Sequence, residues 1–163
     1  MTTGRGALGL EDVQVFRSSG TRGFSPAVAG HPQRREAIKL ENEVTVNFTQ
    51  TPCTINTPEG IVHARAGDAV LRGIAGEQWR VSAARFPEKY RAVPPTVPGQ
   101  SGRYVSLRNR VQAVLMDRAF EVVLADGLSR LRGKAGDWLV DYGDGSLGIV
   151  SAAIFPTTYE LVG

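Results

Sequence analysis

The chain carries an internal repeat, and this repeat limits its fold more than any other feature of the sequence. Residues 66–93 align without a gap to residues 135–162 at a constant spacing of 69 positions, and 12 of the 28 aligned pairs are identical. A weaker match continues upstream at a spacing of 67 positions, where Leu40 and Asn42 align with Leu107 and Asn109. Units of this size bury too little surface to be stable alone. The two copies are therefore expected to pack together or on a partner.

Short alternating runs of polar and apolar residues fill both copies. Residues 43–48 alternate as a half-buried strand does, and turn signals such as Asp126-Gly127 separate the runs. The further strand candidates are 53–56, 61–64, 69–72, 78–82, 111–115, 120–124, 138–142 and 147–150. Each copy ends in Phe-Pro followed by a Tyr, which predicts a short helical turn. The predicted fold is mainly β, with two tandem small β-domains that form open sheets or barrel-like units.

Composition divides the chain into four segments. Residues 1–39 are rich in Gly, Ser, Thr and Arg without a sustained period, which predicts an extended N-terminal arm. Residues 40–93 are the first β repeat, residues 94–106 form a linker with three prolines and two glycines, and residues 107–163 are the second β repeat. We expect the arm to bind a neighbouring subunit through its basic and aromatic residues, Arg5, Phe16, Arg17, Arg22, Phe24, Arg34 and Arg35.

The excess positive charge of the chain lies in the predicted arm. Residues 1–39 carry six Lys and Arg against three Asp and Glu, whereas residues 40–163 carry thirteen of each. The body therefore lacks the basic surplus of a nucleic-acid-binding domain, and nucleic acid is not an expected partner. No apolar run approaches the roughly 20 residues of a membrane span, and no apolar stretch near the start suits a secretory signal. A single cysteine favours a cytosolic origin.

The shared acids and serines do not form a catalytic constellation in the sequence. Asp68 and Asp137 are kept in both copies and could bind a metal or act as bases, but Gly-Asp before a strand is typical of a carboxylate that accepts backbone N–H groups. Ser82 and Ser151 are also shared, and a serine nucleophile needs a base. The only histidines are His31 and His63, and neither has a counterpart in the other copy. We expect no enzymatic activity.

Metal binding is not expected either. Cys53 has no second cysteine and no nearby histidine, which excludes a zinc site of the usual kind, and we expect it to be a small buried hydrophobe. The glycine-rich pieces near 73–76 and 143–148 lack the Gly-Lys-Ser/Thr ending of a phosphate loop. The sequence therefore predicts no cofactor and no metal.

Aromatic and basic residues supply the candidate binding site. Tyr90 and Tyr159 could stack on a ligand or could cap the core, and Trp138 is expected to fill core beside the helical turn. A basic group in the second copy could hold anions and consists of Arg108, Arg110, Arg130 and Arg132, with Lys134 nearby. The first copy has Glu41 and Glu43 where the second has Arg108 and Arg110, so the copies, or neighbouring molecules, are expected to attract each other.

The order of these features resembles a family of small phage and bacterial proteins named for a PGDYG-type motif. The resemblance rests on the basic strand 107–113, the motif Ala135-Gly136-Asp137-Trp138 with its weaker copy at 66–69, and the Phe-x-x-x-Tyr ending of each copy. It covers both repeats and leaves out residues 1–39. The resemblance implies a phage or prophage setting.

Two functions from different classes follow. The first is a non-enzymatic virion protein, such as a capsid decoration or cement protein, that binds protein subunits through its arm. It would be found in the virion or the host cytoplasm, neither secreted nor in a membrane. Deletion of residues 1–39 should then abolish assembly and leave the body folded. The alternative is a protein that binds or sequesters a nucleotide-like anion, with the arginine group and Tyr90 and Tyr159 in each repeat or in the cleft between them.

Overall fold

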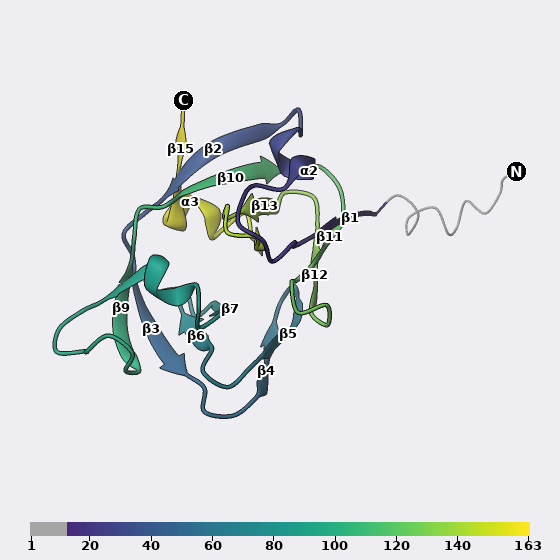
Figure 1. Cartoon of the computed structure of the whole chain (residues 1–163). Coiled ribbons are helices and arrows are strands. Elements are labelled where there is room, and N and C mark those ends of the chain that lie inside the picture. The colour runs from purple at the N-terminus through teal and green to yellow at the C-terminus, as the bar shows by residue number, and fades with distance from the viewer. Residues whose placement is uncertain (1–12) are drawn as a thin grey trace, which may run out of the picture.

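The computed structural model describes residues 13–163, and the fold is mainly β with open sheets and no closed barrel (Figure 1). Two α-helices and one 3-10 helix, each of a single turn, accompany the strands. The helices are α2 (Pro26–Ala29), η2 (Phe86–Glu88) and α3 (Phe155–Thr158). The strands are β1 (Gln14–Arg17), β2 (Arg34–Lys39), β3 (Glu43–Phe48), β4 (Cys53–Thr57), β5 (Gly60–Ala64), β6 (Ala69–Arg72), β7 (Gln78–Val81), β8 (Tyr90–Ala92), β9 (Gly102–Ser106), β10 (Arg110–Leu115), β11 (Phe120–Val123), β12 (Arg130–Gly133), β13 (Trp138–Asp141), β14 (Leu147–Val150) and β15 (Tyr159–Val162).

Two five-stranded sheets share one strand order. The first sheet runs β7-β6-β3-β9-β8 and the second runs β14-β13-β10-β2-β15. Strands β6, β7 and β8 begin 69 residues before β13, β14 and β15, which is the spacing of the sequence repeat. Most of the second sheet lies above the first in Figure 1. The halves thus carry the same series of elements, as the predicted duplication requires; the duplication itself stays a prediction.

Each five-stranded sheet contains one strand that, in the sequence, directly precedes a strand of the other sheet. Strand β2 directly precedes β3 but pairs antiparallel with β10 and β15, where Ala37 lies opposite Val111 and Leu161. Strand β9 directly precedes β10 but pairs with β3 and β8. The two sheets are therefore interlocked through exchanged strands. Neither 40–93 nor 107–163 holds all the strands of its own sheet.

The described part of the predicted arm belongs to the fold itself. Residues 13–39 supply β1, α2 and β2, and Phe16 is only 2% exposed and meets the ring of Phe120 edge-on. Val28 is fully buried in the same cluster. Phe16 is thus a core residue of its own chain, not a docking residue. Its partners on β11 lie about a hundred positions away in the sequence, so no local pattern revealed them. Arg5 lies outside the described residues.

The other predicted arm residues stay on the surface. Arg22 forms an ion pair with Glu88 of the same chain. The rest of the group is exposed or nearly so and comprises Arg17, Phe24, Arg34 and Arg35. These positions leave the predicted contact with a neighbouring subunit untested.

The predicted linker also contributes a strand. Residues 102–106 form β9, and Tyr104 is buried with its hydroxyl donating to the carbonyl oxygen of Gln100 at 2.7 Å. The preceding prolines and glycines form a loop that brings this short strand beside β3. A Pro- and Gly-rich stretch predicts the loop correctly but gives no sign of the strand that follows it.

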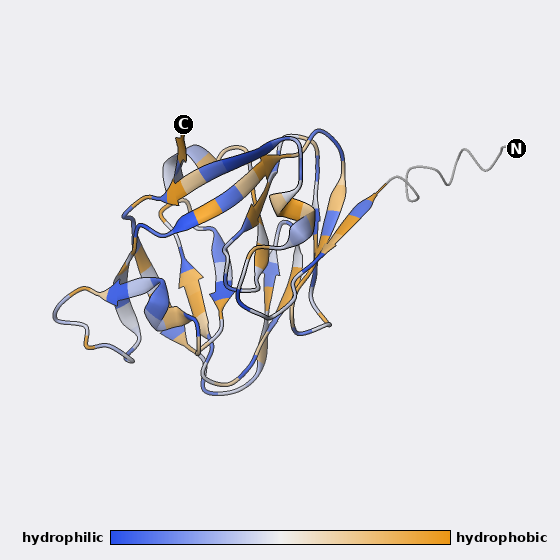
Figure 2. Cartoon of the chain, turned by 45° about the horizontal axis from the view of Figure 1, so that its top comes forward, coloured by the Kyte–Doolittle hydropathy of each residue, from blue (hydrophilic) through white to orange (hydrophobic). Residues whose placement is uncertain are grey.

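Two smaller sheets complete the structure. Strand β1 pairs in parallel with β11, which pairs with β12, and β4 pairs with β5. Hydrophobic and hydrophilic residues alternate along the strands in Figure 2, as half-buried sheets require. Of the described residues, no helix has the length and apolar character needed to cross a membrane.

Candidate functional site

The repeated Gly-Asp motif has the same structural role in both halves. Asp68 and Asp137 are each 5% exposed. The carboxylate of Asp68 accepts the backbone N–H of Arg65 at 2.9 Å, and that of Asp137 accepts the N–H of Lys134 at 3.1 Å. The glycine before each acid has a positive φ, +91° and +97°, which favours glycine. This confirms the predicted hydrogen-bonding role, in which each carboxylate accepts the N–H of the residue three positions earlier.

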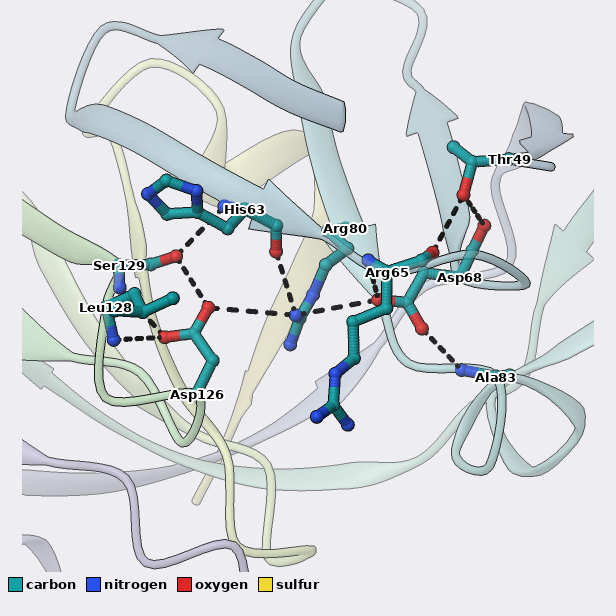
Figure 3. Close-up of polar contacts among 9 residues, drawn as sticks. All are labelled: Thr49, His63, Arg65, Asp68, Arg80, Ala83, Asp126, Leu128 and Ser129. Carbon is teal, nitrogen blue, oxygen red and sulfur yellow. Dashed lines mark hydrogen bonds and ion pairs between the residues drawn. The ribbon is translucent and has the colours of Figure 1, made fainter. Parts of the chain in front are cut away.

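Arg80 joins the two halves beside Asp68 (Figure 3). Its Nη1 donates to the carbonyl oxygen of His63 at 3.0 Å and lies 3.6 Å from Asp68 and 3.9 Å from Asp126. Burial acts to raise the pKa of Asp126, but hydrogen bonds from Ser129 and Leu128 outweigh it and lower the pKa. The arrangement holds the β5–β6 region against the β11–β12 turn.

The same cluster is not a Ser-His-Asp site. The Ser129 hydroxyl donates to Asp126 at 2.7 Å and accepts the backbone N–H of His63 at 2.9 Å. The imidazole of His63 is exposed and points away from Arg80 in Figure 3. Among the described residues, no hydrogen bond joins either conserved serine of the repeat, Ser82 or Ser151, to a histidine. The cluster therefore stabilises structure and has no activated nucleophile.

The predicted arginine group does not gather into one site. Arg130 and Arg132 both pair with Glu121, at 2.9 and 3.3 Å, and Arg108 lies 3.7 Å from Glu160. Arg110 is exposed on the surface. None of the four lines the cavity described below.

The predicted charge attraction between copies is not made within the chain. Glu43 forms a two-pronged pair with Arg103, at 3.0 and 2.7 Å, and Glu41 lies 3.9 Å from Arg91. Both acids therefore pair within the first sheet, away from Arg108 and Arg110. An attraction between neighbouring molecules stays a prediction.

A cavity of about 190 Å³, here called the central cleft, lies between the two five-stranded sheets. Its walls come from β2, β7, the η2–β8 segment, β10, the β13–β14 hairpin and β15, with further residues from the β4–β5 hairpin and β12. The aromatic and charged residues that define it are Lys39, Glu59, Trp79, Arg80, Arg85, Lys89, Tyr90, Tyr142, Asp144 and Tyr159. Segments from both halves of the described chain thus meet at one place.

Lys39, at the end of β2, enters the central cleft among aromatic rings. Its Nζ lies 5.0 Å from the ring centroid of Tyr159, 5.6 Å from that of Trp79 and 6.0 Å from that of Tyr90. Among the described residues it forms no ion pair. Burial lowers the pKa of Lys39 to about 8, although the more distant Glu77 carboxylate acts to raise it. Strand exchange creates this site, because it brings β2 beside β15.

Lys89 lines the same cleft but, unlike Lys39, has a carboxylate partner. Its Nζ lies 3.0 Å from the Asp144 carboxylate and 4.1 Å from the ring centroid of Tyr142. Burial acts to raise the pKa of Asp144, but the Lys89 ammonium and the bonds from Ser146 outweigh it and lower the pKa. Lys89 is thus neutralised within the protein, whereas Lys39 is not.

The repeated tyrosines are both core residues and walls of the central cleft. Tyr90 stacks on Phe86 and Tyr159 on Phe155, each with ring centroids 5.1 Å apart. The indole N–H of Trp79 donates to the Tyr90 hydroxyl at 3.2 Å. Burial raises the pKa of both tyrosines, so their hydroxyls stay protonated. The core position of the two tyrosines is confirmed, and their role as ligand-binding residues stays a prediction.

Two other side chains test the sequence predictions directly. Trp138 stacks on Phe155 at 4.0 Å, which confirms its predicted position beside the helical turn. Cys53 is exposed, so its prediction as a buried hydrophobe is wrong. It begins β4, which pairs with β5 alone, and only the middle residue of β4, Ile55, is buried.

Of the ten aromatic and charged residues of the central cleft, sequence reasoning named only Tyr90 and Tyr159 as candidate binding residues. Four of those it missed are Lys39, Lys89, Tyr142 and Asp144. Lys39 lies in the predicted arm, and the other three lie at positions that differ between the two copies. The repeat directed attention to shared residues, which support the structure. The positions at which the two copies differ could have indicated the site, since Lys89 and Asp144 each appear in one copy only.

The family comparison agrees with the resemblance seen in the sequence. A family model described as PGDYG protein matches residues 60–160. The match covers more than half of the chain, so the chain belongs to the PGDYG family. A search of curated proteins and a search of solved structures each found no match.

Proposed function

We propose that this member of the PGDYG family binds a small planar anion in the central cleft. The supporting observation is Lys39, a cation without an ion-pair partner among the described residues, surrounded by the rings of Trp79, Tyr90 and Tyr159. Aromatic faces favour flat ligands, and an ammonium group without a counterion favours a negative one. A ligand carboxylate or phosphate would supply the counterion that the protein does not.

The charge of the whole cleft supports an anion. Of the four cationic side chains that line it, Arg80 pairs with Asp68 and Asp126 and Lys89 pairs with Asp144, whereas Lys39 and Arg85 have no ion-pair partner among the described residues. Burial raises the pKa of Glu59, which weakens its negative charge. The Nε–H of Arg80 is buried and has no hydrogen-bond partner among the described residues. A buried donor of this kind costs free energy until an acceptor arrives.

The size of the cleft narrows the choice of ligand. A volume of about 190 Å³ is similar to the roughly 150 Å³ of an apolar protein cavity that holds one benzene molecule. This suits a single aromatic ring with an acidic group, or a nucleobase. We therefore propose a ligand with one planar ring and one acidic group. Such a ligand is smaller than the nucleotide-like anion expected from the sequence.

The capsid decoration role stays a second, separate prediction. Its arm is now limited to exposed residues such as Arg17, Arg34 and Arg35, because Phe16 and Val28 are buried in the chain's own core. A very large symmetric assembly, measured by light scattering, would favour this role. A monomer or dimer would count against it and leave ligand binding as the proposed function.

Isothermal titration with orotate, benzoate and the neutral benzamide tests the proposed function. We expect the anions to bind and benzamide to bind at least about tenfold more weakly, a difference of about 1.4 kcal/mol. Lys39→Met should weaken the anions by a similar factor. Lys134→Gln, which removes an exposed lysine outside the cleft, should change nothing. Equal binding of the wild type and Lys39→Met would contradict the proposal.

A further inference from the structure

The three lysines of the chain differ sharply in their surroundings. Lys134 is exposed and lies outside the central cleft. Lys89 lines the cleft but forms an ion pair with Asp144 at 3.0 Å. Lys39 lines the cleft with aromatic rings around its Nζ and no ion pair among the described residues. Only Lys39 combines access to the cleft with freedom from a carboxylate.

The surroundings of Lys39 increase the fraction of the neutral amine, although the ammonium form still predominates at neutral pH. The groups that face its Nζ are the indole of Trp79 and the phenols of Tyr90 and Tyr159, both kept protonated by burial. The one acid that acts on it, Glu77, does not offset the cost of burying the charge, and the pKa falls to about 8. The rings attract the ammonium form, but burial outweighs them. Near pH 8 about half of the Lys39 side chains carry a free lone pair.

We propose that Lys39 forms a reversible imine with a planar carbonyl compound that also carries an acidic group. This inference rests on the proposed binding of planar anions in the central cleft and names their reactive class. The Nζ lone pair attacks the carbonyl carbon and forms the C–N bond of a carbinolamine. The carbonyl oxygen then leaves as water with the two amine protons, and a C=N bond remains. No oxidant or reductant takes part.

The rest of the cleft suits such a compound. Its ring would lie against the aromatic walls, which also limit access of water to the imine. Its acidic group would accept from Arg80, whose Nε–H lacks a partner among the described residues, or from Arg85. Lys39 comes from β2 and these arginines from β7 and the segment before η2, so different elements would hold the carbonyl and the acidic group.

The test uses 4-carboxybenzaldehyde as the probe, with sodium cyanoborohydride to reduce the imine to a stable amine. The full-length protein is treated at pH 8 and digested, and the modified residue is located by mass spectrometry. Among the lysines, we expect the carboxybenzyl group on Lys39, with at least about tenfold less on Lys89, which pairs with Asp144, and on Lys134, which lies outside the cleft. An adduct on the α-amino group, which is partly neutral at pH 8, is counted separately. Lys134→Gln should label as the wild type does.

Two variants and one unreactive analogue keep the test decisive. Lys39→Arg and Lys39→Met should both lose the adduct, and circular dichroism should show that at least one of them is folded. The analogue 4-methylbenzoate should bind the wild type without reaction. Binding of the analogue with no adduct on Lys39 would overturn the imine and leave the proposed function standing. Absence of any binding would overturn both, and equal labelling of all three lysines would show that Lys39 has no special reactivity.

Discussion

At the scale of single residues, the acids that the repeat keeps stabilise the fold, and the residues that it changes form the cleft. Asp68 illustrates the first class, because its carboxylate accepts backbone N–H groups from Arg65 at 2.9 Å and Ala83 at 3.2 Å. Lys39 and Lys89 illustrate the second. A sequence can predict the first class from the motif alone, since Gly-Asp before a strand has few other uses. The second class depends on partners that are distant in sequence.

Asp68→Ala should destabilise the protein by about 2–3 kcal/mol, because it removes the acceptor of two part-buried N–H groups and one of the two carboxylates beside Arg80. Urea unfolding followed by fluorescence measures the change. Asp117→Ala removes a side chain that is 87% exposed and should change stability by less than about 0.5 kcal/mol. Equal effects of the two substitutions would show that Asp68 does not support the turn.

The lowered pKa of Lys39 predicts a specific pH dependence of stability. Its pKa is about 8 in the folded protein and 10.5 in the unfolded chain, so the unfolded state binds more protons between these values. Stability should therefore rise with pH from about 8 to 10, by at most about 1.4 kcal/mol per pH unit.

The matched variant for this pH dependence is Lys39→Met, which should lack the rise. Above about pH 10 the buried tyrosines lower the stability of both proteins. Burial raises their pKa in the folded state, so the unfolded chain loses these protons first and ionisation favours unfolding. Unfolding free energies of both proteins across pH 7 to 10 make the comparison. Parallel curves would mean that Lys39 keeps its ordinary pKa.

At the scale of elements, local pattern identified the strands and missed the pairings. The runs predicted at 43–48, 69–72 and 147–150 are β3, β6 and β14 with the same limits. Strand β2 has mostly polar residues and only Ala37 fully buried, so it has no clear alternation. Strands β8 and β9 are short and follow turn or loop segments. The exchange of β2 and β9 depends on contacts between distant segments, which periodicity does not encode.

The exchange makes residues 13–39 necessary for folding. Deletion of residues 1–39 removes β1 and β2 and the buried Phe16, so we now expect it to unfold the body and not to leave it intact. A milder probe is Ala37→Asp, which places a carboxylate between Val111 and Leu161 and should cost at least about 3 kcal/mol. Arg35→Asp, two residues earlier on the exposed part of β2, should cost little.

Thermal unfolding compares these two variants with the wild type. If Ala37→Asp melts at the same temperature as Arg35→Asp, β2 does not lie between β10 and β15 in the second sheet. The exchange of strands would then be wrong, and so would the position of Lys39 in the central cleft.

At the scale of the whole molecule, interlocked sheets bring unlike halves together around one cleft. Strands β2 and β9 occupy equivalent places in the two five-stranded sheets. If the sheets were identical, these strands would end in the same residue, but β2 ends in Lys39 and β9 ends in the buried Ser106. The asymmetry gives the cleft a lysine, Lys39, that forms no ion pair among the described residues. Because the sequence repeat drew attention to Tyr90 and Tyr159, half of the aromatic wall could be predicted. The cations could not, since the predicted arginine group pairs elsewhere on the surface.

The most direct test of the proposed function is a nuclear magnetic resonance titration of the protein labelled with ¹³C at the lysine ε carbons. Three lysines give three signals, and Lys134→Gln and Lys39→Met assign two of them. We expect the Lys39 signal to titrate near pH 8 and to move when orotate or benzoate is added, while the Lys134 signal stays in place. A Lys39 signal that titrates near 10.5 and ignores both anions would contradict the proposal that the central cleft binds planar anions.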